Sequence, residues 1–136
     1  MRVIRVTWKF MLVLFVLGIV HQEYLQHDPN KDTYLKEASQ MIECLEIDET
    51  REISRRSGMG KVGRFSIRVV YEQSVSFETV ILGLKRNFKN NGWELIAEGN
   101  THLDRYGMSY RKGIWEATVE GYRDRYTLGL YRRKFR

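Results

Sequence analysis

The chain has 136 residues, 43% of them hydrophobic and 29% charged, a composition that excludes disorder throughout. Its length allows one folded domain, because the roughly 115 residues after the first twenty or so suffice for one hydrophobic core but not for two. A single cysteine excludes an intrachain disulfide, and with only three scattered histidines the ordinary zinc-binding frameworks are excluded too.

The formal net charge of +6 is unevenly distributed along the chain. Residues 1–21 carry +3, residues 22–60 carry −4, and residues 61–136 carry +7. We therefore divide the chain into an N-terminal segment (1–21), a polar neck with an amphipathic helix and a flexible link (22–60), and a small basic domain (61–136).

The N-terminal segment has the layout of an export signal. Residues 10–20 read FMLVLFVLGIV, without a polar side chain, and follow Arg2, Arg5 and Lys9. Eleven apolar residues are few for a bilayer helix, which needs about 20, but residues 6–20 could anchor the chain if Lys9 reaches the headgroups. A cleaved signal peptide and an uncleaved anchor both remain open, whereas a buried first helix of a cytosolic domain fits the one-sided positive charge poorly. With either a signal peptide or an anchor, we expect the rest of the chain to lie outside the cytoplasm, secreted in the first case and anchored in the membrane in the second.

Residues 32–47 have helical periodicity, with one apolar stripe. This helix either packs on its own domain or is offered to another protein. Cys44, on this helix, is expected to pack rather than react. The stripe consists of Tyr34, Leu35, Ala38, Met41, Ile42 and Leu45.

Residues 54–63, SRRSGMGKVG, are typical of a flexible link. Their glycines Gly58, Gly60 and Gly63 match the spacing G-x-G-x-x-G. In a dinucleotide site, however, such glycines follow a strand and begin a helix, whereas these follow a charged stretch and precede a strand. The context therefore argues against nucleotide binding.

The next elements follow from changes of period. Residues 65–71 alternate as a half-buried strand, and residues 77–88 repeat at helical spacing, with Ser74 or Ser76 as the cap and Asn91-Gly92 as the stop. A strand over residues 93–97 follows.

The remaining residues are predicted to form a meander. Residues 106–122 form one strand with a bulge, or two strands with a turn, at Lys112-Gly113, and a last strand begins at Tyr126. The predicted fold class is α+β: an N-terminal hydrophobic signal or anchor segment, an amphipathic helix, then a β-α-β-β-β two-layer domain with an antiparallel sheet and one helix packed across it.

Residues for catalysis are scarce, and we expect neither an enzyme nor a cofactor or metal. His21 and His27 fall in the neck and His102 in a loop, so no nucleophilic triad is indicated. Carboxylates for glycoside cleavage could be sought among Glu94, Glu98, Glu116 and Glu120, but the last two alternate with apolar residues as solvent-facing strand residues do.

Bases interleaved with tyrosines at the C-terminal end are the candidate binding surface. The alternative is that these residues have no binding role, because tyrosines and cations are common on an exposed sheet face and on edge strands. We expect a protein partner in the cell envelope or outside the cell; the alternative is an anionic envelope ligand, a polysaccharide or a lipid headgroup. The export signal disfavours nucleic acid. The candidate residues are Tyr122, Arg123, Arg125, Tyr126, Arg132 and Arg133.

Overall fold

The computed structural model describes residues 11–17, 30–60, 64–100 and 105–133. The chain forms two compact units, Met1–Lys31 and Asp32–Arg136. In the first unit, residues 11–17 are helical and all seven side chains are apolar and 49–70% exposed. Within the described residues, no helix is long and apolar enough to cross a membrane.

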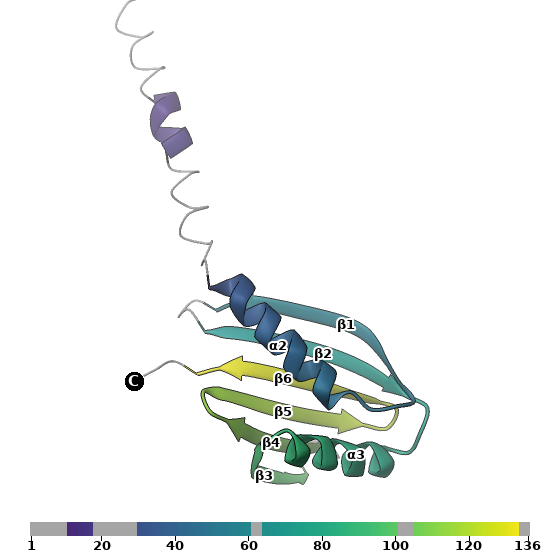
Figure 1. The fold of residues 1–136 in the computed structure, drawn as a ribbon. Coiled ribbons are helices and arrows are strands. Elements are labelled where there is room, and N and C mark those ends of the chain that lie inside the picture. The colour runs from purple at the N-terminus through teal and green to yellow at the C-terminus, as the bar shows by residue number, and fades with distance from the viewer. Residues whose placement is uncertain (1–10, 18–29, 61–63, 101–104, 134–136) are drawn as a thin grey trace, which may run out of the picture. The chain divides into compact units, whose positions relative to one another are not determined.

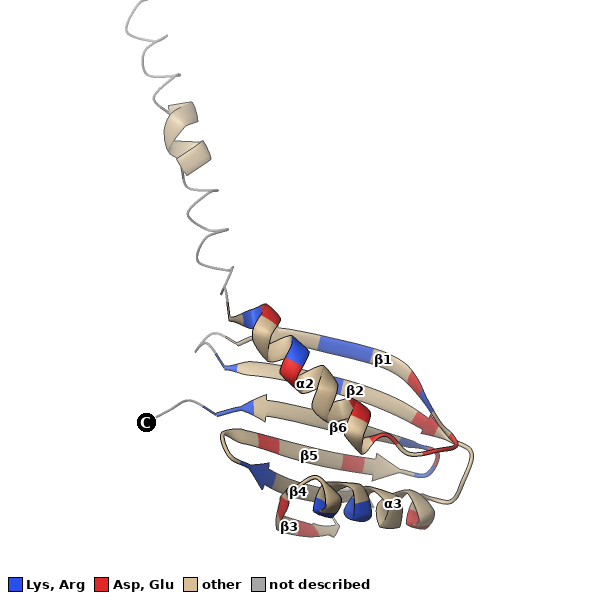
Figure 2. Ribbon diagram, viewed as in Figure 1, with Lys and Arg blue, Asp and Glu red and all other residues tan. Residues whose placement is uncertain are grey.

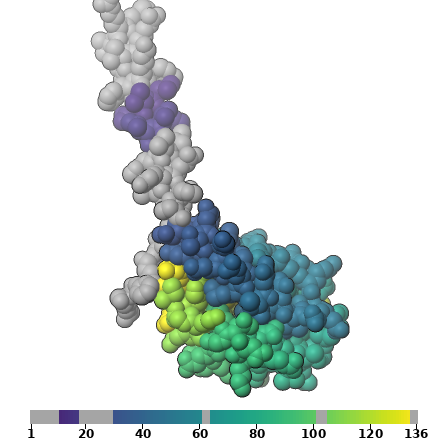
Figure 3. Space-filling view, in the orientation of Figure 1, coloured from purple at the N-terminus to yellow at the C-terminus, as the bar shows by residue number. Residues whose placement is uncertain are grey.

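The second unit contains two helices and one six-stranded sheet (Figure 1). The strands lie in the order β1-β2-β6-β5-β4-β3, and every neighbouring pair is antiparallel. Both helices lie on the same face of the sheet (Figures 1 and 3). The α+β class and the antiparallel sheet are thus confirmed. In chain order the elements are α2 (Lys31–Leu45), β1 (Thr50–Met59), β2 (Phe65–Gln73), α3 (Phe77–Asn90), β3 (Glu94–Asn100), β4 (Tyr106–Lys112), β5 (Trp115–Tyr122) and β6 (Arg125–Arg132).

Helix α2 turns its apolar stripe to the sheet. Ala38, Ile42 and Leu45 are buried, and they recur at the spacing that places residues on one side of a helix. The helix therefore packs on its own domain, the first of the two predicted alternatives. Cys44, in contrast, is exposed rather than packed, because it lies beside this stripe and not within it.

Helix α3 begins and ends where the sequence predicts. Ser76 is the N-cap, and its Oγ accepts a hydrogen bond from Thr79 N at 3.3 Å. Asn91 is the C-cap, and Gly92 takes φ +80°, a conformation that glycine adopts without strain. Val80, Leu84 and Phe88 face the core.

Aromatic rings fill much of the space between helices and sheet. Phe88 stacks on Tyr110 with ring centroids 3.9 Å apart. The Phe77 ring lies against the backbone of Gly121, where a Cβ atom would be 2.0 Å from the ring. Burial of these rings provides a large share of the hydrophobic stabilisation of a domain this small.

Two details of the predicted order are wrong. A strand, β1, occupies most of the predicted flexible link and pairs with β2 along its length. Two helices rather than one cover the sheet, because α2 joins α3 on the same face. Of the two alternatives predicted at Lys112-Gly113, the turn is present: it divides residues 106–122 into β4 and β5, and Gly113 has φ +59°, as tight hairpins require.

Candidate functional site

The face of the sheet opposite α2 and α3 is covered by no described helix, and we call it the open face. Buried residues alternate with less buried ones along β2, β5 and β6, so every second side chain points to the open face. A shallow pocket of about 560 Å³ lies on it, lined mainly by polar side chains. Its lining includes Arg68, Arg105, Thr118, Glu120, Tyr122, Arg125, Thr127 and Tyr131.

Tyr131 lies across the middle of the open face. A Cβ atom at Gly129 would be 2.9 Å from the Tyr131 hydroxyl and 3.0 Å from Thr118 Oγ1, so the tyrosine side chain folds back over the glycine. A hydrogen bond between Arg68 and the Tyr131 side chain raises the pKa of the arginine. An arginine and a tyrosine therefore form a polar platform on the sheet.

Charged pairs surround this platform. Glu72, Glu116 and Glu120 point to the open face, and each binds at least one arginine. All of these pairs are exposed, so each contributes little to stability. The pairs are Arg51–Glu72 at 2.6 Å, Arg105–Glu120 at 3.3 Å, and Arg111–Glu116 and Arg133–Glu116, both at 3.5 Å.

Arg56 and Arg125 on the open face form no ion pair with a described residue. Arg56, on the edge strand β1, stands directly opposite Arg68 of β2, so their side chains share the open face. Arg125 stands opposite Glu72, but that carboxylate binds Arg51. Arg56 and Arg125 are thus exposed cations available to another molecule.

The β5–β6 turn forms one end of the open face. Its Arg123 has φ +58°, in the left-handed region, and its guanidinium lies 4.9 Å from the centroid of the Tyr122 ring. Buried Gln73 supports the turn: its side chain donates to Arg123 O at 3.0 Å, and its backbone N–H donates to Asp124 O at 2.9 Å.

The six predicted binding residues do not form one surface. Tyr122, Arg123 and Arg125 lie together at the β5–β6 turn. Tyr126 is buried in the core, stacked on Tyr71 with ring centroids 5.0 Å apart. Its side chain is therefore not part of an exposed surface.

The other two predicted arginines lie at the far end of β6 (Figure 2). Arg132 is on the helix side, where its guanidinium lies 4.1 Å from the centroid of the Tyr34 ring. Arg133 donates to Gly113 O at 2.7 Å and lies 3.5 Å from Glu116. Side-chain alternation and the length of the strand thus separate these arginines from the β5–β6 turn.

Three of the four acidic residues considered for glycoside cleavage bind basic side chains. Glu116 and Glu120 bind arginines on the open face, whereas Glu98 lies on the other side and binds Lys85 at 2.6 Å. Hydrogen bonds from Lys85 and then Tyr106 lower the pKa of Glu98, which keeps it ionised at neutral pH, unsuited to act as a general acid. Among the described residues, no group of histidine, cysteine and acidic side chains could hold a metal ion.

Sequence reasoning missed Arg56 and Arg68 as members of the candidate surface. Arg68 could have been predicted from the sequence, because it alternates with Ile67 and Val69 in a strand that the sequence predicts. Arg56 gave no such signal, since it lies in the stretch taken for a link. Comparisons of the chain with protein families, curated proteins and solved structures find no match.

Proposed function

We propose that this chain is an exported, membrane-tethered, non-catalytic domain whose open face binds an acidic surface of a protein partner, in the cell envelope or outside the cell. The observation that carries the proposal is the open face itself. It presents the unpaired cations Arg56 and Arg125 beside the Arg68–Tyr131 platform. Arginine and tyrosine are both enriched at protein interfaces.

The open face has the size of a modest protein interface. Six strands about 4.8 Å apart and about eight residues long give a surface of roughly 24 by 26 Å, or about 600 Å². A standard interface buries about 800 Å² on each partner, so a single complex of ordinary or slightly small size fits this face.

The charge pattern favours a protein over the alternative ligand, an anionic polymer or lipid headgroup. Glu72, Glu116 and Glu120 are interspersed with the arginines, so the field over the open face has no single sign. A polyanion carries a negative charge on every repeating unit, so some of its charges would be repelled by these carboxylates. A folded partner can instead place a charge of opposite sign against each arginine and each carboxylate of the open face.

The tether in this proposal is the N-terminal segment. The seven helical residues 11–17 expose apolar side chains only, and the sequence before them contains Arg2, Arg5 and Lys9. The remainder of the predicted anchor, residues 6–10 and 18–20, lies outside the described residues. Exposed apolar residues behind a positive end support insertion into a membrane.

Site-specific photocrosslinking in the producing cells tests the proposed interface. A benzophenone amino acid at Thr127, on the open face, should capture one protein, because the side chain would lie within the complex. The same group at Leu82, 65% exposed on α3, is the matched control and should capture little. Capture of the same protein from both positions, or from Leu82 alone, would contradict the proposal.

A charge variant tests how the partner is held. Replacing Arg56, Arg68 and Arg125 with Gln should lower the yield of the crosslink from Thr127, since it removes the cations of the open face. Folding should change little, because exposed charges each contribute within about 0.5 kcal/mol. The control replaces Lys36, Arg86 and Lys89, exposed on α2 and α3, and should leave the yield unchanged.

A fusion tests the location. A reporter enzyme that is active only outside the cytoplasm, joined after Arg136, should be active. Activity of a cytoplasm-specific reporter at the same position would refute export, while the crosslinking results would stand independently.

A further inference from the structure

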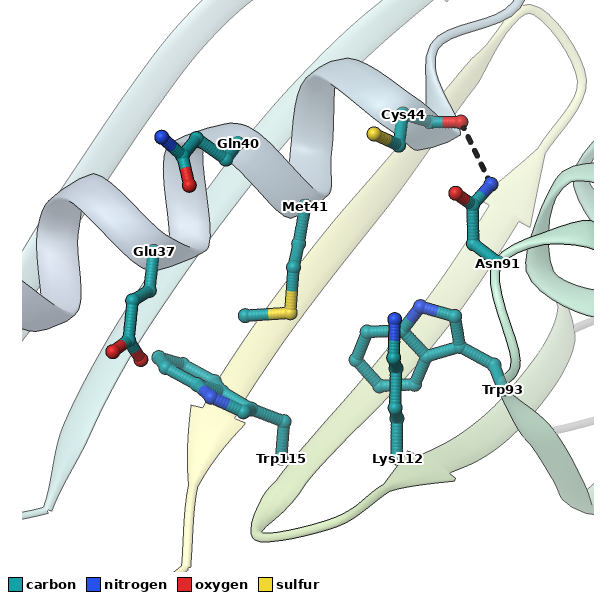
Figure 4. A pocket seen from close by; sticks show the side chains of 8 residues that line it. All are labelled: Glu37, Gln40, Met41, Cys44, Asn91, Trp93, Lys112 and Trp115. Atoms are coloured by element: carbon teal, nitrogen blue, oxygen red, sulfur yellow. Dashed lines mark hydrogen bonds between the residues drawn. The ribbon is translucent and has the colours of Figure 1, made fainter.

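A second recess lies on the helix side of the sheet, away from the open face. It has a volume of about 320 Å³ and lies between α2 and the β4–β5 hairpin (Figure 4). Its apolar lining comes from Met41, Trp93 and Trp115, and its polar lining from Glu37, Gln40, Asn91 and Lys112. A recess that combines aromatic walls with polar groups able to orient a ligand is a usual form of small-molecule site.

The local structure explains why these side chains meet. Lys112 and Trp115 stand directly opposite each other across the two-residue turn that contains Gly113, so both point to the same side of the sheet. Trp93 follows the end of α3, and its ring packs edge-on against Phe88 at 5.6 Å. The position of each wall is thus set by a hairpin or by the core.

The Asn91 amide at the recess donates to Cys44 O and Asn87 O, whereas two other donors there are unpaired within the described chain. Lys112 forms no ion pair there, and the Trp93 indole N–H has no acceptor. In Figure 4 the Lys112 ammonium and the Trp93 indole nitrogen both point toward α2, into the open space of the recess. The Lys112 side chain also lies beside Gly92, where a Cβ atom would be 3.8 Å from Lys112 Cε.

We propose that this recess binds a small amphipathic monocarboxylate. An aromatic or branched apolar group contacts Met41 and Trp115, and the carboxylate accepts hydrogen bonds from Lys112 and from the Trp93 indole. Hydrogen bonds to an ionised group are the strong ones, so the carboxylate supplies much of the selectivity. Glu37 stands at the end away from Lys112 and repels a second anionic group, which disfavours dicarboxylates.

The test uses the full-length chain in a non-ionic detergent, with ¹⁵N-labelled tryptophan. The probes are N-acetyl-L-phenylalanine and its neutral amide, each added up to about 20 mM, well above a Kd of about 1 mM. We expect the Trp93 and Trp115 indole resonances to shift saturably, with the carboxylate bound at least about tenfold more tightly than the amide. Trp8, the third tryptophan of the chain, is the internal control for non-specific effects of the probes on indole resonances.

Two variants complete the test. Lys112→Met keeps the apolar stem and should abolish the preference for the carboxylate, whereas Lys36→Met, an exposed lysine of α2 outside the recess, should preserve it. Equal affinity for acid and amide in the unaltered chain, absence of saturable indole shifts, or a preference that survives Lys112→Met would each overturn the proposal. None of these outcomes bears on the open face, because the probes contain no protein partner.

Discussion

Helix α3 offers a sharp stability test, because two leucines on it are in opposite environments. Leu84 is 0% exposed, against the sheet, while Leu82 is 65% exposed. Leu→Ala removes the same three carbon groups at both positions. At Leu84 their transfer from the core to water contributes about 2.4 kcal/mol. A residual cavity of about 50 Å³ adds about 1.2 kcal/mol, so we expect Leu84→Ala to lower the free energy of unfolding by about 3.5 kcal/mol.

The measurement is urea unfolding of the full-length chain, followed by circular dichroism at 222 nm. Leu82→Ala should change the free energy of unfolding by less than about 0.5 kcal/mol, since it alters no buried contact. In thermal unfolding, Leu84→Ala should lower the Tm by about 14 to 28 °C, at about 4 to 8 °C per kcal/mol for a domain of this size. Equal effects of the two substitutions would refute the helical phase and the packing of α3 on the sheet.

Three further predictions concern backbone and titration. Gly121→Ala should destabilise the domain by about 1 to 3 kcal/mol, because its Cβ would lie 2.0 Å from the Phe77 ring, and urea unfolding measures the loss. Arg123→Gly should raise the Tm, since it relieves a left-handed φ of +58° that costs about 1 kcal/mol for a non-glycine residue; an unchanged or lower Tm would contradict this. Burial raises the pKa of Tyr126 to about 12, against about 10 in the unfolded chain. The contribution of this shift to the free energy of unfolding is therefore complete below pH 10 and is lost as the pH rises to about 12, by up to about 1.4 kcal/mol per pH unit. Tyr126→Phe should make that alkaline loss shallower, as measured by urea unfolding at pH 9 to 12.

Elements whose signals are local could be predicted from the sequence. Helix α3 contains its own apolar stripe, its N-cap Ser76 and its stop at Asn91-Gly92, so no distant contact is needed to define it. Strand β1 could not be predicted, because its side chains are almost all exposed and lack the alternation of a half-buried strand. Its pairing with β2 defines it, and that pairing depends on tertiary structure.

The candidate site shows the same division. Tyr126 shares a face with Leu128 and Leu130, and that alternation could have excluded it from an exposed surface. The meeting of Arg56 with Arg68 depends on the register of β1 against β2, which no local pattern in the sequence indicates. The binding residues predicted from the C-terminal stretch alone are therefore scattered over both ends and both faces of the sheet.

The central claim, that a partner covers the open face, is tested most directly by hydroxyl-radical footprinting. Oxidation of Tyr122 and Tyr131 is measured by mass spectrometry in membranes of the producing cells and in the purified full-length chain. Tyr122 is 40% exposed in the free chain, and Tyr131 lines the same open face. We predict that oxidation of both tyrosines is strongly reduced in the membranes, while oxidation of Leu82 on α3 is unchanged. Equal oxidation of the two tyrosines in both samples would contradict the account.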